Sequence, residues 1–201
     1  MPLETKLKAS KLAKRILAVH EAGHAVLGWN EPLMSTVKKV RIWAKQRRGD
    51  TIFKTRYTSP CDEDDYLADI AVDLAGSVAE KIVFGKWSNV NGDDLNHARA
   101  QIEEMICEHG MSKIGPLHLL GRPMSAVMRH RVEAETQKML DERLAFVEER
   151  LRDPKLRKQL DLVTEALLDR KKLKKRDLKE LLGKRPKAKK LRAKTNARRK
   201  K

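Results

Sequence analysis

The sequence has 201 residues and a formal net charge of +17, with 40% hydrophobic and 4% aromatic residues. That length fits one domain with an aliphatic core and an appendage. The segment 171–201 holds 17 lysines and arginines against two acids, which leaves a net charge of only +2 on the rest of the chain. The body of the protein therefore gives no indication that it reads nucleic acid.

The first predicted element is a helix over residues 5–29, where apolar residues recur at intervals of three and four. Residues 30–32, Asn-Glu-Pro, end this pattern. Apolar and polar residues then alternate over 40–44, residues 46–50 break the run, and 51–57 is again rich in strand-forming residues. These two runs predict a small two-stranded element.

Helices are predicted for the rest of the chain. The acidic run 62–65 favours the positive end of a second helix, which ends at Gly85. The turn at 91–94 is expected to cap a third helix that ends before Gly110. Three further helices are predicted, over residues 131–151, 155–169 and 176–182.

This order predicts a mainly α domain over residues 1–184, with a small two- or three-stranded sheet near its N-terminal half. Residues 185–201 hold ten lysines and arginines, no acid and one large apolar residue, Leu191. Such a segment cannot bury enough apolar surface to offset the entropy of ordering. We therefore expect a disordered basic tail.

Cys61 and Cys107 lie far apart and match no zinc or redox spacing. No run approaches the roughly 20 apolar residues that a membrane helix needs. Residues 1–15 contain lysines but no apolar stretch or cleavage site of a signal peptide. These features predict a soluble, cytoplasmic protein in a reducing compartment, without a membrane span.

One motif carries catalytic chemistry. His20-Glu21-Ala22-Gly23-His24 is an H-E-x-x-H pattern on the first predicted helix. A spacing of four puts both imidazoles on one face, where they can bind one zinc ion. Zinc lowers the pKa of a bound water toward about 7 and polarises a scissile carbonyl. Glu21 would be the general base that takes the proton of that water and passes it to the leaving amine.

A catalytic zinc ion usually has three protein ligands, so a third remains to be found. A downstream glutamate is a common choice, and Glu80 on the second helix fits it. Asp93 and Asp94 stand at the start of the third helix, and His97 lies one turn beyond Asp94. Spacing alone leaves these four alternatives open.

The chain resembles the proteolytic domain of the FtsH family of membrane-anchored, ATP-dependent zinc proteases. Four segments carry the resemblance, in the family's order, and it extends from about residue 14 to residue 182. They are residues 18–25 around the H-E-x-x-H motif, residues 74–85, Asp94-Leu95 with Ala98, and the loop 110–117.

The resemblance implies that one zinc ion per chain is held by His20, His24 and Asp94, with Glu21 as the base. Glu80 then becomes a candidate for orienting a ligand histidine, with an ordinary surface carboxylate as the alternative. For His97 we favour an ordinary helix histidine. The family also assembles into hexameric rings, so a homo-hexamer is implied.

The printed sequence contains no Gly-x-x-x-x-Gly-Lys-Ser/Thr loop, which the ATPase half of the family carries. In that family the ATPase unfolds substrates and feeds them to the zinc site. We therefore expect this chain to cut proteins or peptides that are already unfolded or flexible, unless a separate ATPase acts in trans.

Substrate binding is predicted along the run 51–57. A strand at the edge of a sheet presents unpaired amides and carbonyls to which an extended peptide can add. Thr51, Ile52 and Phe53 are the candidate contact residues, and a purely structural strand is the alternative.

Two other functions remain open. The chain could be a non-catalytic adaptor that assembles with a separate ATPase. Alternatively, its basic tail could bind nucleic acid with strongly salt-dependent, sequence-blind affinity. The tail has no interleaved aromatic residues, so base stacking by the tail is not indicated.

Overall fold

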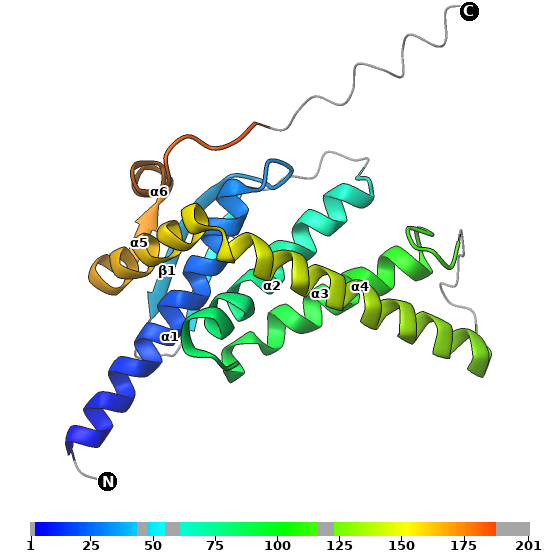
Figure 1. Ribbon diagram of the computed structural model, residues 1–201, viewed down its shortest axis with the longest axis horizontal. Coiled ribbons are helices and arrows are strands. Elements are labelled where there is room, and N and C mark those ends of the chain that lie inside the picture. The colour runs from blue at the N-terminus through cyan, green and yellow to red at the C-terminus, as the bar shows by residue number, and fades with distance from the viewer. Residues whose placement is uncertain (1–2, 44–47, 55–60, 116–122, 188–201) are drawn as a thin grey trace, which may run out of the picture.

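The computed structural model describes residues 3–43, 48–54, 61–115 and 123–187. Within them the protein is mainly helical with a small antiparallel sheet, which confirms the predicted fold class. Figure 1 shows α1 between α5 on one side and α2 on the other, with its N-terminal end projecting from the body. The elements are α1 Leu3–Asn30, β1 Val37–Trp43, β2 Arg48–Phe53, α2 Glu63–Phe84, the 3-10 turn η1 Asn89–Asn91, α3 Gly92–Cys107, α4 Ala126–Arg152, α5 Pro154–Arg170, β3 Lys172–Lys174 and α6 Lys175–Leu182.

The central packing is between α1 and α2. Helix α1 is buried from Leu17 to Asn30, and most residues of α2 are buried from Ala68 to Glu80. A Cβ atom added at Gly23 would lie 2.4 Å from the carbonyl oxygen of Ala75 and 2.8 Å from the Cβ of Ala79. Glycine at this position therefore lets the two helix backbones approach closely.

The ends of α2 confirm the sequence signals. Asp62 is the N-cap, and it exchanges side-chain-to-backbone hydrogen bonds with Asp65 in a capping box. Gly85 ends the helix in the left-handed conformation, with φ of 71°, and its N–H donates to the carbonyl of Lys81. Ser59 and Pro60, which precede this start, lie outside the described residues.

Two other helices begin differently from the prediction. The expected capping turn at 91–94 is the end of η1 and the first turn of α3, so Asp94 is already inside the helix. Helix α4 starts at Ala126, capped by the hydroxyl of Ser125, rather than near residue 131. Serine is a favoured N-cap residue, whereas Arg129-His130-Arg131 carries no start signal.

The sheet has the order β2-β1-β3, with both pairings antiparallel. Strand β2 begins at Arg48, inside the segment interpreted as a break, and ends at Phe53. Residue 44 of the first predicted strand and residues 55–57 of the second lie outside the described residues. The C-terminal half of the chain was predicted to contain helices only. The structure adds the third strand there, β3 Lys172–Lys174, which pairs with β1.

The chain after α6 is attached to the body. The indole N–H of Trp29 donates to the carbonyl of Gly183 at 3.2 Å. The Arg185 guanidinium donates to the Thr36 hydroxyl and to the backbone carbonyls at positions 29, 31 and 34. The sequence predicts that Arg185 belongs to the disordered tail. The structure instead holds its side chain beside the start of β1. The tail residues 188–201 lie outside the described residues, and the domain boundary stays a prediction.

Among the helices of the described segments, none combines the length and the apolar run that crossing a bilayer requires. Cys61 and Cys107 are both free thiols.

Candidate metal centre

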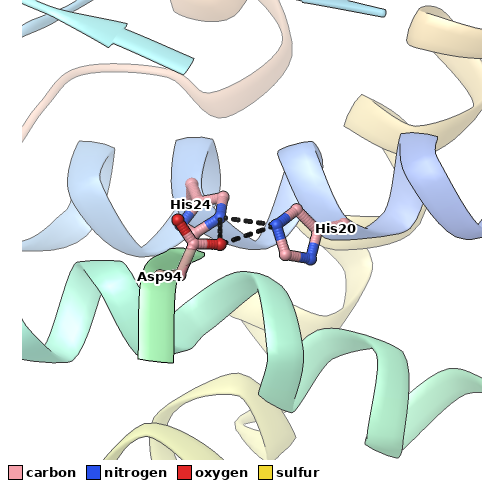
Figure 2. Close-up of side chains that lie close together, drawn as sticks. All are labelled: His20, His24 and Asp94. Atoms are coloured by element: carbon pink, nitrogen blue, oxygen red, sulfur yellow. Dashed lines mark hydrogen bonds and ion pairs between the residues drawn. The ribbon is translucent and has the colours of Figure 1, made fainter. Parts of the chain in front are cut away.

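Three side chains from two helices converge at one point (Figure 2). His20 and His24 lie one turn apart on α1, and Asp94 comes from the first turn of α3. The Oδ2 atom of Asp94 lies 2.9 Å from Nε2 of His20 and 3.2 Å from Nε2 of His24. The two Nε2 atoms are 3.0 Å apart. Three potential ligand atoms therefore form a small triangle.

The size of this triangle fits a zinc ion. Zinc binds histidine nitrogen and carboxylate oxygen at about 2.0–2.2 Å in tetrahedral geometry, so two of its ligand atoms lie roughly 3.3 Å apart. The separations of 2.9–3.2 Å are close to that value. Two imidazoles and one carboxylate also form a donor set that zinc prefers, so these three residues could hold a metal ion.

Both imidazoles are fixed by hydrogen bonds on their far side. Nδ1 of His24 lies 2.7 Å from the backbone carbonyl of Val72, to which it can only donate. Nδ1 of His20 lies 2.8 Å from Oε1 of the buried Glu80. The other oxygen of Glu80 accepts from the backbone N–H of Ser88 at 3.1 Å. Partners that keep the proton on Nδ1 leave Nε2 of each ring able to bind a metal.

Helix α2 supplies the floor of the centre through a glycine. A Cβ atom at Gly76 would lie 2.5 Å from Nε2 of His24 and 2.7–2.8 Å from ring atoms of His20. Any side chain at this position would therefore push the imidazoles out of place.

The candidate base, Glu21, is only 5% exposed and lies against strand β2. Its Oε2 atom accepts a hydrogen bond of 2.7 Å from the hydroxyl of Thr51. A Cβ atom at Gly49 would lie 2.4 Å from Oε1, so the strand backbone approaches the carboxylate directly. Burial raises the pKa of Glu21, and the neighbouring imidazoles and the Thr51 hydroxyl oppose that shift.

The carboxylates of Asp94 and Glu80 favour a proton on His20 in the metal-free centre. Burial alone would lower the pKa of His20, but hydrogen bonds to Asp94 and Glu80 raise it to about 9. Burial would likewise raise the pKa of Asp94, but the two imidazoles lower it well below its usual range. The metal-free site therefore favours a protonated His20 beside an ionised Asp94 at neutral pH.

A cleft of about 890 Å³ opens over these residues. Thr51 and Phe53 of β2 line it, whereas Ile52 does not. Asp93 lines the cleft too but is not part of the triangle, because consecutive helix residues point about 100° apart. Of the four alternatives for a third ligand, the structure therefore brings only Asp94 to both imidazoles.

His97 lies away from the centre. Its side chain is 64% exposed, and Nδ1 is 2.7 Å from Oδ2 of Asp73 on α2. Burial raises the pKa of Asp73 to about 6, against the opposing effect of His97. The pair joins α2 to α3 one turn beyond Asp94, and so helps to set the position of that first turn.

Sequence reasoning missed the contacts made by backbone and by glycine. The Val72 carbonyl and the positions of Gly49 and Gly76 carry no chemical signal of their own. A glycine within an otherwise helical run, such as Gly76, is a weak indication of close approach by another group.

Comparisons with known proteins show which proteins this chain is similar to. The family model described as peptidase family M41 matches residues 7–181. A protein of Aster yellows witches'-broom phytoplasma, named ATP-dependent zinc metalloprotease FtsH, is 29% identical over 186 residues, covering 90% of this chain and 28% of its own length. The FtsH protein of Acholeplasma laidlawii is 36% identical over 118 residues, covering 58% of this chain and 18% of its own length.

A plant relative is also similar. The Arabidopsis thaliana protein named ATP-dependent zinc metalloprotease FTSH 11, chloroplastic/mitochondrial, is 32% identical over 181 residues, covering 86% of this chain and 22% of its own length. The chain thus spans less than a third of the length of these curated relatives.

Proposed function

The chain belongs to peptidase family M41, and from this premise we propose that it is a zinc-dependent endopeptidase acting on unfolded or flexible polypeptides. The observation that carries the proposal is a buried carboxylate, Glu21, beside the triangle of His20, His24 and Asp94. A chain that only binds proteins would have no use for a buried acid next to three metal-ligating atoms.

We assign His20, His24 and Asp94 as the residues that would hold zinc. The bound ion would supply Lewis-acid polarisation of the scissile carbonyl and acidify a water molecule. Glu80 and the Val72 carbonyl orient the two imidazoles through their Nδ1 protons.

Glu21 acts as the base. Its carboxylate takes one proton from the attacking water, whose oxygen forms the new bond to the carbonyl carbon of the substrate. The same proton then passes to the amine nitrogen as the carbon–nitrogen bond breaks. The Thr51 hydroxyl, bonded to Oε2, holds the carboxylate toward the cleft during both transfers. The raised pKa of Glu21 suits a group that must hold a proton between the two steps.

Strand β2 is the proposed binding site for the substrate backbone. It is the edge strand of the order β2-β1-β3, and in the described residues it pairs only with β1. Its residues Gly49 and Thr51 already contact Glu21, so a peptide added to this edge would lie across the cleft. Thr51, Ile52 and Phe53 would contribute mainly through their backbone, which gives broad sequence tolerance.

The partners of the chain follow from the same premise. The relatives are named ATP-dependent proteases, and this chain spans less than a third of their length. We propose that folded substrates reach the cleft only after an ATPase has unfolded them, and that the catalytic assembly is a homo-hexamer. A cytoplasmic location stays a prediction.

The decisive experiment compares the full chain with Glu21→Gln in the hydrolysis of unfolded, fluorescently quenched casein without ATP. The variant should keep one zinc ion per chain, because Glu21 is not a ligand, and its rate should fall by about 10²–10⁴-fold. Glu149→Gln, an exposed change on α4, is the matched control and should leave the rate unchanged.

Zinc content and cleavage separate the alternatives. Hydrolysis that continues unchanged in Glu21→Gln would refute this mechanism. Stoichiometric zinc without any hydrolysis by the unmodified chain would favour the non-catalytic adaptor, especially if an ATPase co-purifies with it.

A further inference from the structure

The side of the sheet that faces away from the helices carries a concentration of positive charge. Along β1, Val40 and Ile42 are buried, so Lys39, Arg41 and Trp43 point to the other face. On β3, Leu173 is buried, and Lys172 and Lys174 are exposed. The basic sheet face is defined by these five outward residues: Lys39, Arg41, Trp43, Lys172 and Lys174.

Pairing between the strands brings like charges together. Lys174 is the register partner of Lys39, and Lys172 is the partner of Arg41. Residues directly opposite one another in an antiparallel pair have Cβ atoms about 4.5–5.5 Å apart, and like charges at that distance are destabilising. A sheet that needed only solubility could alternate the signs, so this arrangement points to an anionic ligand.

Arg41 differs from the three lysines because it has partners. Its guanidinium donates to both carboxylate oxygens of Asp50, at 2.7 and 2.6 Å, and lies 4.1 Å from the ring centroid of Trp43. This holds a planar cation over an aromatic ring. Guanidinium planes and aromatic rings are the groups on which proteins stack unpaired bases.

The lysines are not neutralised in this way. Within the described parts of the chain, no carboxylate forms an ion pair with Lys39, Lys172 or Lys174. Same-strand neighbours on this face are two residues apart, about 6.6–6.8 Å, so the charges form short rows along β1 and β3.

Arg185, the first residue of the basic C-terminal sequence, is bound near one end of the same sheet. Arg185 bonds to the hydroxyl of Thr36, the residue before β1 begins, and Lys39 and Lys174 pair near that end of the sheet. Residues 185–201 contain ten lysines and arginines. The first residue of this basic sequence, Arg185, is therefore held near one end of β1.

We propose that the basic sheet face binds single-stranded nucleic acid, with the three lysines on backbone phosphates and the Arg41–Trp43 pair beneath a base. This goes beyond the peptidase activity, and it places nucleic-acid contact on the folded body rather than in the tail alone. None of these five residues lines the cleft, although Asp50, the partner of Arg41, does.

The test measures binding of a fluorescein-labelled 20-nucleotide oligothymidine to the full chain by anisotropy over a range of salt concentrations. The triple variant K39Q/K172Q/K174Q should bind on the order of a hundredfold more weakly at 0.1 M salt. Its slope of log affinity against log salt should be smaller by about two, at about 0.7 per lost phosphate contact. The matched control K86Q/K155Q/K158Q removes three exposed lysines outside the sheet and should change affinity less than about threefold.

A second pair of variants tests base stacking. Trp43→Leu should weaken binding of the single strand by roughly tenfold without changing the salt slope. Trp87→Leu, which removes a tryptophan that is 42% exposed outside the sheet, should have no effect. Thermal unfolding of all variants checks that none of these losses reflects a damaged fold.

Several outcomes would overturn the proposal. They are no measurable binding by the unmodified chain, equal losses in the two triple variants, equal affinity for a duplex of the same length, and equal affinity for polyglutamate. Casein hydrolysis measured in parallel should be unaffected by K39Q/K172Q/K174Q, so the proposal and the peptidase assignment can fail independently.

Discussion

The metal centre and the basic sheet face both crowd charged side chains into a small space, but they do so in opposite ways. At the metal centre the ionisable groups are buried and each has a partner of complementary chemistry, as in the contacts of His20 with Asp94 and Glu80. On the basic sheet face the three lysines form no ion pair within the described residues, and the register sets lysine against lysine and arginine.

This difference determines how each region should respond to change. A buried charge that loses its partner incurs the full cost of desolvation, which is several kcal/mol for a paired ion. An exposed charge that loses a like-charged neighbour gains a little stability. Substitutions at the metal centre should therefore have large, unfavourable effects, and those on the sheet face small, favourable ones.

The largest effect is expected at Gly76, where an added Cβ would meet both imidazoles within 2.8 Å. Gly76→Ala should lower the free energy of unfolding by about 1–3 kcal/mol, as overpacking does, and should displace the histidines. We expect zinc affinity to fall by on the order of a hundredfold or more. Chelator competition and chemical denaturation measure the two quantities.

Gly92→Ala is the matched control. Gly92 has helical φ of −62° and open space around its Cα, so alanine there should be neutral or stabilising by about 0.4–1 kcal/mol. If both alanine variants bound zinc equally well, the close packing of α2 against the imidazoles would not matter for the metal.

A smaller loss of zinc affinity is expected for a substitution at Glu80. Glu80→Gln keeps the size of the side chain but weakens its hold on Nδ1 of His20, so zinc affinity should fall about 10–100-fold. Glu149→Gln on the surface should leave zinc affinity unchanged. The comparison is measured by competition with a chelator of known affinity, and an unchanged value for Glu80→Gln would reduce this residue to a packing role.

The pH dependence of zinc binding should follow the proton on His20. Because its pKa in the metal-free protein is about 9, zinc must displace a proton at pH 7. The apparent affinity should therefore rise about tenfold per pH unit for each proton released, up to about pH 9, and fall toward acid pH. Calorimetry in two buffers with different ionisation enthalpies counts the protons. Equal heats in both buffers would contradict a protonated site.

The smallest effect is expected on the sheet. Lys174→Gln removes the like charge opposite Lys39, so it should raise the free energy of unfolding by about 0.2–1 kcal/mol. Lys155→Gln, an exposed change on α5, should leave the stability unchanged. Denaturation at low salt measures the difference, which 1 M salt should screen. A destabilised Lys174→Gln would show that the two lysines are not in conflict.

Most helices could be predicted because their signals are local. The acids at the start of α2 and Gly85 at its end act within one turn of the chain, and both positions are confirmed. Strand β3 could not be found, because Lys-Leu-Lys has one apolar residue and pairs with a strand some 130 residues away. Its conformation depends on tertiary pairing rather than on its own composition.

The candidate site divides in the same way. His20 and His24 lie within one helix, so their closeness could be predicted from their spacing in the sequence. Selecting Asp94 needed a resemblance, because the angle between α1 and α3 decides which acid reaches the imidazoles. The contact of Glu80 with Nδ1 of His20 depends on how closely α1 and α2 pack, which no local pattern specifies.

The late position of β3 in the chain has a consequence for synthesis on the ribosome. Helices α1 to α3, which carry the candidate zinc ligands, are complete once residue 107 has emerged. The edge of β1 that pairs with β3 stays unpaired until residues 172–174 have been synthesised. Until then its amides and carbonyls can pair with other nascent chains. Lys38 and Lys39 near the start of β1 are charged residues of the kind that discourage such pairing. Charges that oppose one another in the finished sheet would then protect the unfinished one.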